Sequence, residues 1–263
     1  MADLLRPSRK PRNGKEVLCE YVFRPAAQIV AVALAPLRVP PPAVVLAAGA
    51  TGLVAAYLIG SGPLVVAALL LQLKTVLDNA DGQLARLTDR VTVFGRYLDS
   101  ESDLVVDAAI FAAIGWATGR WILVAAGFLC LTLVLGVNYN VERLYRREVG
   151  DPAEPMPAAS GVAGLLARVY AAVYAPQDRL VEGFVERRLR NRSPRARLAY
   201  HDRATVTVLA NFGLSTQLAA LGICLAAGAP DVYAWVAIGC AGALVPLAIR
   251  RELLLRRHID NGR

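Results

Sequence analysis

Six apolar segments, each close to twenty residues long, constrain what this chain can fold into more than any other feature. They span residues 42–60, 63–84, 97–117, 121–141, 204–228 and 231–249. A helix of ~20 residues crosses the ~30 Å hydrocarbon core of a bilayer. The segments lack the apolar–polar alternation of membrane strands, so helices are the only plausible spanning elements. With 56% hydrophobic and 19% charged residues, the chain is predicted to be an all-α integral membrane protein with six transmembrane helices.

The basic residues are distributed unevenly between the two ends of these spans. Of the 29 Lys and Arg residues, 27 fall within 1–41, 85–96, 143–203 and 250–263, which six spans place on one side. The other side holds only Arg120, and Lys74 lies within a span. The positive-inside rule therefore places both termini in the cytoplasm of a cell with a bacterial-type inner membrane. Topology explains the net charge of +8, and no nucleic-acid partner is expected.

The predicted organisation has three parts: a cytoplasmic N-terminus with an interfacial helix (1–41), a six-helix transmembrane domain (42–249) with a cytoplasmic connection (143–203), and a basic cytoplasmic tail (250–263). Residues 16–38 are apolar but interrupted by one arginine and two prolines, so we expect an amphipathic helix at the membrane interface. Residues 161–175 are too short to cross comfortably and are expected at the interface too. The basic tract 186–197 is expected to be a loop facing water or lipid headgroups.

An acidic stretch, DNADGQLARLTDRVTVFGRYLDSESD (78–103), lies at the facing ends of the second and third spans. Ionisable groups at membrane depth are costly, so they are functional candidates by default. Asp78 and Asp81 are three residues apart, and Asp99 and Asp103 are four apart, so each pair shares a helical face. A short loop would bring the two faces together near the membrane surface. Clustered carboxylates need a counter-charge, and oxygen-only ligands favour two Mg²⁺ or Mn²⁺ ions.

Other residues in the same stretch suit a phosphate ester. Gly82 and Ala85 keep the helix surface low, so a nucleotide can approach the backbone, and Arg86 offers a planar fork to a phosphate. Gly95 permits close approach where the third span begins. Two metal ions a few Å apart can activate and clamp a phosphoryl centre. The stretch therefore predicts a metal-dependent site for a phosphate ester.

From Asp78 onward the chain reads D-x2-D-G-x2-A-R-x8-G-x3-D-x3-D, which resembles the signature of the CDP-alcohol phosphotransferase family at every position. The resemblance implies Mg²⁺- or Mn²⁺-dependent transfer of a phosphoalcohol from a CDP-linked donor, often CDP-diacylglycerol, to an acceptor hydroxyl, with release of CMP. It implies that the metal ligands are Asp78, Asp81, Asp99 and Asp103, with Asp103 also the general base. It implies that the CDP site is formed by Asp78, Gly82, Ala85, Arg86 and Gly95. The chain departs from the family at 39–45, where VPPPAVV replaces a Thr-Pro-Asn turn that helps to seat the nucleotide.

The acceptor is predicted to be a polyol or a polyol phosphate of the inositol phosphate or glycerol phosphate type. A phosphorylated acceptor needs cations near the base, and the candidates are Arg143, Arg146 and Arg203, although each also suits a positive-inside anchor. Lys74 precedes Asp78 by one helical turn and is expected to form an ion pair with it. Asp107 continues the stripe of the third span without belonging to the signature, and either supports the site or pairs with a polar group.

Several alternatives remain open from the sequence. The donor could be a soluble CDP-polyol such as CDP-inositol rather than a lipid. Intramembrane prenyltransferases also use aspartate-rich motifs with Mg²⁺, but their motifs lie on distant spans. A non-enzymatic divalent-cation transporter would explain lined-up carboxylates but not the glycine, alanine and arginine of the signature. The resemblance also implies a homodimer, for which the small-residue segments GATG (49–52) and GCAGA (239–243) offer faces for close packing.

Overall fold

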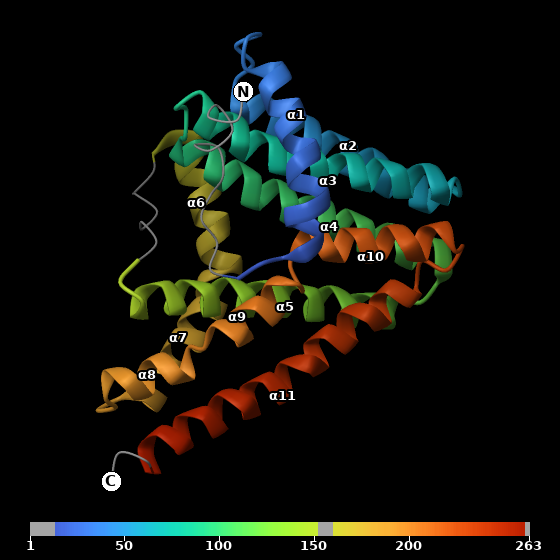
Figure 1. The fold of residues 1–263 in the computed structure, drawn as a ribbon. Helices are drawn as coiled ribbons and strands as arrows, with labels where there is room; N and C mark the ends of the chain where they lie inside the picture. Colours follow the sequence, from blue (N-terminus) through green and yellow to red (C-terminus); the bar gives the residue numbers. More distant parts are fainter. Residues whose placement is uncertain (1–13, 152–159, 261–263) are drawn as a thin grey trace.

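The computed structural model describes residues 14–151 and 160–260. Within these ranges the secondary structure consists of helices, with no strand (Figure 1). The predicted N-terminal segment 1–13 and the last three residues of the basic tail lie outside the described residues. The helices are the π-helix η2 (Cys19–Phe23), α1 (Arg24–Leu34), α2 (Pro41–Ser61), α3 (Leu64–Leu87), α4 (Val93–Thr118), α5 (Trp121–Glu148), α6 (Gly161–Val173), α7 (Ala175–Leu189), α8 (Pro194–Tyr200), α9 (Arg203–Ala210), α10 (Leu214–Ala226) and α11 (Val232–Asp260).

Four helical stretches in the described part of the chain are long and apolar enough to cross a membrane: Pro41–Ser61, Trp121–Glu148, Pro194–Ala226 and Val232–His258. The chain is therefore a multi-pass membrane protein. Helices α3 and α4 are 24 and 26 residues long, which is sufficient to span, but both carry part of the acidic stretch. They run alongside α2 in Figure 1. The prediction of six spans therefore depends on whether these two acidic helices also cross.

The two segments expected at the interface are both helical. In Figure 1, α1 and α6 cross the common direction of α2, α3 and α4, and they pack against α3 and α4 respectively. The interfacial placement of both helices stays a prediction. The expected loop at 186–197 is shorter than predicted and comprises only residues 190–193, since α7 extends to Leu189 and α8 begins at Pro194. Ion pairs from these two helices to neighbouring ones explain the difference: Arg188 donates to Glu252 at 2.9 Å, and Arg197 donates to Glu148 at 3.0 Å.

The predicted fifth span, 204–228, is interrupted, because α9 ends at Ala210 and α10 begins at Leu214. The Asn211 side chain donates to the carbonyl oxygens of Thr207 and Lys15, at 2.8 Å each, and accepts from the Val17 amide at 2.9 Å. Glu16 accepts from the Thr216 amide at 2.9 Å. Polar groups freed by a helix break must find partners at membrane depth. The segment just before η2 supplies them here.

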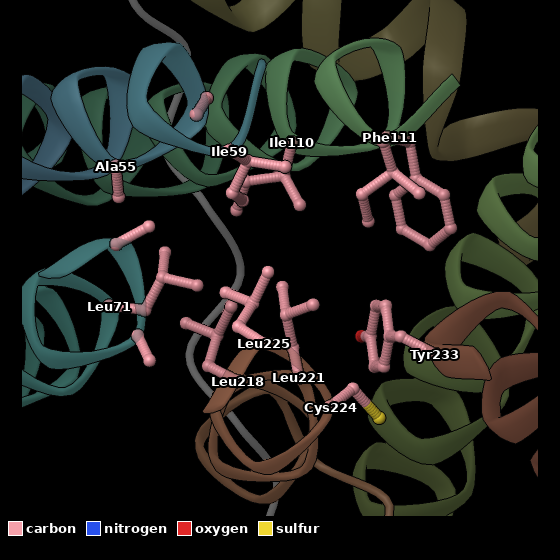
Figure 2. Close-up of a cluster of buried hydrophobic side chains, with 14 of the residues drawn as sticks. Ala55, Ile59, Leu71, Ile110, Phe111, Leu218, Leu221, Cys224, Leu225 and Tyr233 are labelled. Carbon is pink, nitrogen blue, oxygen red and sulfur yellow. The ribbon is translucent and has the colours of Figure 1, made fainter. Parts of the chain in front are cut away.

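A hydrophobic core joins α2, α3, α4, α10 and α11, as Figure 2 shows. Leu71 of α3 and Ile110 of α4 meet Leu218 and the other buried leucines of α10, all of them 1% exposed or less. Phe111 packs against Tyr233 with ring centroids 5.5 Å apart. These residues lie on the parts of α3 and α4 remote from the loop that joins the two helices. The core therefore fixes one end of the helix pair and leaves the acidic end beside the loop.

Helix α2 lies very close to α4 because its facing residues are glycines. A Cβ placed on Gly52 would lie 2.5 Å from Cγ1 of Val106, and one on Gly49 would collide with the Ser102 hydroxyl. The GATG segment therefore packs within the chain, and its proposed use as a dimer face is wrong. Positions Gly239 and Gly242 have no heavy atom within 4 Å of such a Cβ, so the second small-residue face stays available for the predicted homodimer.

Candidate active site

The acidic stretch lies on α3, on α4 and on the loop at 88–92 that reverses the chain between them. Thr92 begins α4 by accepting a hydrogen bond from the Gly95 amide at 3.1 Å, a standard N-terminal cap. Asp89 in the loop has φ 54°, a left-handed conformation that Asp tolerates better than most residues. Helix α2 packs against both acidic helices, which approach each other less closely than either approaches α2. Polar side chains therefore meet across the space between α3 and α4.

Three of the four predicted metal ligands come together in this space. Asp78, Asp99 and Asp103 each offer a carboxylate oxygen within 4.8 Å of the others, and all three are half-buried. The predicted meeting of the acidic edges of α3 and α4 is thus present. Asp81 is 6% exposed and lies outside this group, about one helical turn further toward the loop. Its role as a ligand stays a prediction.

Lys74 places a buried positive charge among these carboxylates. Its side chain forms an ion pair with Asp78, as the spacing predicted, and its Nζ also donates to Oδ1 of Asp103 at 2.6 Å. The residue is 0% exposed. The second contact crosses from α3 to α4 and was not expected from the sequence. Lys74 therefore links the two acidic helices.

The connection between α5 and α8 folds back toward α4. Asp107, four residues beyond Asp103, is 7% exposed. Burial, followed by the charges of Asp107, Glu101 and Asp103, raises the pKa of the Tyr174 phenol well above its ordinary value. Tyr174 therefore lies near the carboxylates on the inward stripe of α4. The connection 143–203 consequently places helix α6 and Tyr174 beside α4, close to the acidic cluster.

A cavity of about 220 Å³ opens beside the carboxylates. It lies between α3, α4 and α5 and is closed by the break between α9 and α10. The lining residues are Glu16, Thr75, Asp78, Asn79, Asp99, Asp103, Leu135, Asn138, Glu142, Ala210, Gly213, Leu214, Ser215 and Leu218. Irregular backbone at membrane depth is tolerated where it faces a cavity, and here Gly213 does so. A polar cavity at the end of a carboxylate cluster is where a hydroxylated substrate could reach the acidic groups.

Several lining residues were missed by sequence reasoning. Glu142 and Ser215 belong to no motif recognised in the sequence, and Glu16 lies in a stretch interpreted only as an interfacial helix. A signal for the cavity wall was present, because Asn211 and Gly213 interrupt an apolar run. Of the two intramembrane asparagines on α5, Asn138 lines the cavity, whereas Asn140 is turned toward α7 and donates to Asp178 at 2.6 Å.

The predicted CDP-binding residues continue along α3 toward the loop. A Cβ placed on Gly82 would meet the guanidinium of Arg86 first, at 3.4 Å, so the helix surface there is low. Ala85 and Arg86 are half-buried in the last turns of the same helix, and Gly95 opens α4 across the loop. None of these four residues lines the cavity described above. Their part in nucleotide binding stays a prediction.

The three arginines expected near an acceptor phosphate lie away from the cavity. Arg143 donates to Glu182 of α7 at 3.2 Å, and Arg146 donates to Asp151 at 3.0 Å. Arg203 is exposed at the start of α9. None of the three belongs to the cavity lining. Two of them thus serve ion pairs at the ends of helices, and their binding of an acceptor remains a prediction.

A multi-pass helical protein with clustered carboxylates beside a polar cavity belongs to the class of membrane proteins that could act on phosphate esters with divalent ions. Comparison with known families narrows the class. Residues 38–183, more than half of the chain, match the CDP-alcohol phosphatidyltransferase family, and the chain belongs to this family. It is accordingly a phosphotransferase.

Individual relatives agree with this assignment. The chain is 34% identical over 130 residues to a phosphatidylinositol phosphate synthase of Corynebacterium glutamicum, covering 44% of this chain and 58% of the relative. It is 34% identical over 102 residues to a bifunctional IPC transferase and DIPP synthase of Thermococcus kodakarensis, covering 38% and 23%. A protein of the same name from Aquifex aeolicus is 36% identical over 81 residues, covering 28% and 18%. The matches thus span less than two thirds of each relative's length.

Proposed function

We propose that this protein transfers a phosphoalcohol group, the phosphatidyl group of CDP-diacylglycerol, to a hydroxyl of a polyol or polyol phosphate and releases CMP. The observation that carries the proposal is the meeting of Asp78, Asp99 and Asp103 beside a polar cavity. The resemblance described above makes these three residues signature positions, and the chain belongs to that family. The transfer would belong to phospholipid biosynthesis.

The donor atoms of the cluster fit the divalent ion that the family generally uses. Three carboxylates on two helices offer only hard oxygen ligands within 4.8 Å of one another, a set that suits Mg²⁺ or Mn²⁺. Asp78, Asp99 and Asp103 would hold the ion, with Asp81 as the fourth ligand that the resemblance implies. A bound divalent ion supplies positive charge for the phosphate oxygens of the donor.

The side chains themselves bring the reactants together and move a proton. Asp103 lines the cavity, so its carboxylate can accept the proton of an acceptor hydroxyl. The hydroxyl oxygen then bonds to the phosphorus that carries the diacylglycerol, and the bond from that phosphorus to the oxygen of CMP breaks. Gly82, Ala85, Arg86 and Gly95 would hold the CDP part of the donor beside the cluster.

Within the acceptor class, the cavity favours a free polyol over a polyol phosphate. Among the described residues that line it, none is a lysine or an arginine, whereas Glu142, Asn138 and Ser215 offer hydrogen-bonding groups. A carboxylate accepts hydrogen bonds from hydroxyls but repels a phosphate. A phosphorylated acceptor would require Arg143, Arg146 or Arg203 to turn toward the cavity.

The test is an assay of the purified full-length chain in detergent with CDP-diacylglycerol, Mg²⁺ and paired acceptors, each offered free and phosphorylated. We expect CMP release with a lipid product in the organic extract, and faster release with the free polyol. Release confined to the phosphorylated member of each pair would reverse the acceptor assignment. A water-soluble product formed only from a CDP-polyol would favour the soluble donor. Metal flux into proteoliposomes without any CMP release would instead favour a cation transporter.

The setting we propose is the inner membrane, with both termini and the acidic site facing the cytoplasm. The distribution of basic residues supports it, because the excess lies at the end of the spans where the acidic stretch also lies. Membrane lipids then surround the apolar faces, and CDP-diacylglycerol reaches the site from the bilayer. A homodimer is proposed through the glycine face of α11, whose Gly239 and Gly242 lie open.

A further inference from the structure

Lys74 is held in the acidic cluster by the packing of its own stem. It lies one turn before Asp78 on α3, and its side chain is 0% exposed. The stem passes the glycine face of α2, where a Cβ on Gly52 would lie 3.4 Å from Cδ of Lys74 and 2.5 Å from Val106 of α4. A lysine at membrane depth normally extends its ammonium to the nearest water. Here α2, α3 and α4 surround the stem, so the ammonium can reach only the carboxylates.

The ammonium occupies a bridging position between the two acidic helices. It contacts Oδ2 of Asp78 on α3 and Oδ1 of Asp103 on α4, the latter at 2.6 Å. A pair of metal ions needs carboxylate oxygens for both ions, and two oxygens of this cluster are already hydrogen-bonded to a fixed cation. The described residues offer one group of three ligand atoms within 4.8 Å of one another, one each from Asp78, Asp99 and Asp103.

We propose that the Lys74 ammonium takes the place of one of the two metal ions, so that the site binds one divalent ion per chain. Two-metal phosphoryl-transfer sites hold their ions about 3.5–4 Å apart, each neutralising part of a shared acidic cluster. A buried ammonium between Asp78 and Asp103 neutralises the same carboxylates, and it would repel a second divalent ion at that distance. The inference rests on the proposed function, since it assumes that the cluster binds a catalytic metal.

The experiment counts Mn²⁺ ions bound to the full-length chain in detergent, by electron paramagnetic resonance with a parallel equilibrium titration. We expect one Mn²⁺ per wild-type chain, with the spectrum of an isolated ion. In Lys74→Met, which keeps the length of the stem but removes the charge, we expect two ions per chain with a spin-coupled spectrum. Lys74→Arg keeps the charge and should bind one ion. Arg120→Met removes a charge at the opposite end of the bundle and should also bind one.

The possible outcomes distinguish failure of this inference from failure of the proposed function. Two coupled ions in the wild-type chain, together with CMP release, would overturn the inference and leave the proposed function standing. A single ion in both wild type and a folded Lys74→Met would also overturn it, because the lysine would then not set the number. No bound ion and no CMP release would contradict the proposed function itself. If Lys74→Met does not fold, the shorter neutral variant Lys74→Ala takes its place, and a single ion in that variant would overturn the inference.

Discussion

Asp103 makes two contacts that suit the general-base role proposed for it. It lines the cavity, where an acceptor hydroxyl can reach it, and it accepts a hydrogen bond from the buried Lys74 at 2.6 Å. That hydrogen bond orients one carboxylate oxygen and leaves the other for the divalent ion and the acceptor hydroxyl that we propose. Asp78 shares the lysine but lies on α3, beside the residues expected to hold CDP. In the function that we propose, α3 would therefore hold the donor and α4 would face the acceptor.

Asp103→Asn should lower kcat for CMP release by about 10²–10⁴-fold, the range for loss of a general base. The amide keeps the size of the side chain but does not accept the proton. Asp89→Asn is the matched control, because Asp89 is an exposed loop residue with φ 54°, which Asn also tolerates. The measurement is initial-rate CMP release under saturating Mg²⁺. Full turnover by Asp103→Asn would remove this residue from the mechanism.

At the scale of the helices, the close approach of α2 and α4 aligns Lys74 with Asp103. Gly49 and Gly52 allow α2 to lie against Ser102 and Val106 without any intervening side chain. The stem of Lys74 passes the same face of α2. A change in the spacing of these two helices would consequently alter both stability and the geometry of the cluster.

Gly52→Ala should destabilise the fold by about 1–3 kcal/mol, as overpacking of a filled interface does. Its Cβ would lie 2.5 Å from Val106, so α2 must move away from α4. Gly60→Ala on the same helix is the control, since the nearest heavy atom to a Cβ there lies at 3.9 Å; it should be neutral or add ~0.5–1 kcal/mol through helix propensity. Thermal unfolding in detergent measures both. Equal midpoints for the two variants would show that the α2–α4 contact is looser than described.

Residues just before η2 form hydrogen bonds that stabilise the break between α9 and α10. Glu16→Ala removes acceptors for the amide and hydroxyl of Thr216, at 2.9 and 3.0 Å. Leaving such groups unsatisfied costs about 1–3 kcal/mol, and the cavity wall at Gly213 should loosen. We expect a lower unfolding midpoint and a higher KM for the acceptor. Lys15→Ala is the control, because Lys15 contributes only its carbonyl to Asn211. A drop in both variants alike would assign the effect to the whole segment.

Features set by residues close together in the sequence were predicted, whereas features that depend on distant partners were missed. Apolar runs near twenty residues long and the i, i+3 and i, i+4 spacing of the aspartates are local, and they located the helices and the acidic edge correctly. The break at Asn211 was missed because its partners, Lys15 and Val17, are nearly two hundred residues away. The tract 186–197 was taken for a loop because the carboxylates that pair with its arginines lie on α5 and α11. Of the cavity lining, Asp78, Asp99 and Asp103 were predicted as site residues. Glu16, Glu142 and Ser215 were missed, because the lining draws on segments far apart in the chain.

In the whole molecule, the hydrophobic core and the acidic cluster lie toward opposite ends of the helical bundle. The core of Figure 2 holds the ends of α3 and α4 remote from their loop, and near that end Arg120 pairs with Asp231 at 2.7 Å, linking the α4–α5 and α10–α11 turns. The acidic cluster and the cavity lie toward the other end, where the basic residues concentrate. An enzyme that receives lipid from the bilayer and polar substrates from water needs its site near one membrane surface.

Single-cysteine variants should report which membrane surface the acidic site faces. They are made in a chain whose four native cysteines are replaced. Ser61→Cys lies at the exposed end of α2, and Arg192→Cys lies in the basic loop between α7 and α8. In right-side-out vesicles, a membrane-impermeant maleimide should label position 61 directly and position 192 only after permeabilisation, because basic loops stay in the cytoplasm. Labelling in the reverse order would place the acidic site outside the cell.

The claim on which the account depends is that carboxylates of two neighbouring membrane helices jointly hold a divalent ion. An experimental structure of the full-length chain grown with Mn²⁺, with anomalous diffraction recorded for the metal, tests this most directly. The account predicts an anomalous peak within coordination distance of Asp78 on α3 and of Asp99 and Asp103 on α4. A peak bound by only one of these helices, or the absence of any peak between them, would contradict it.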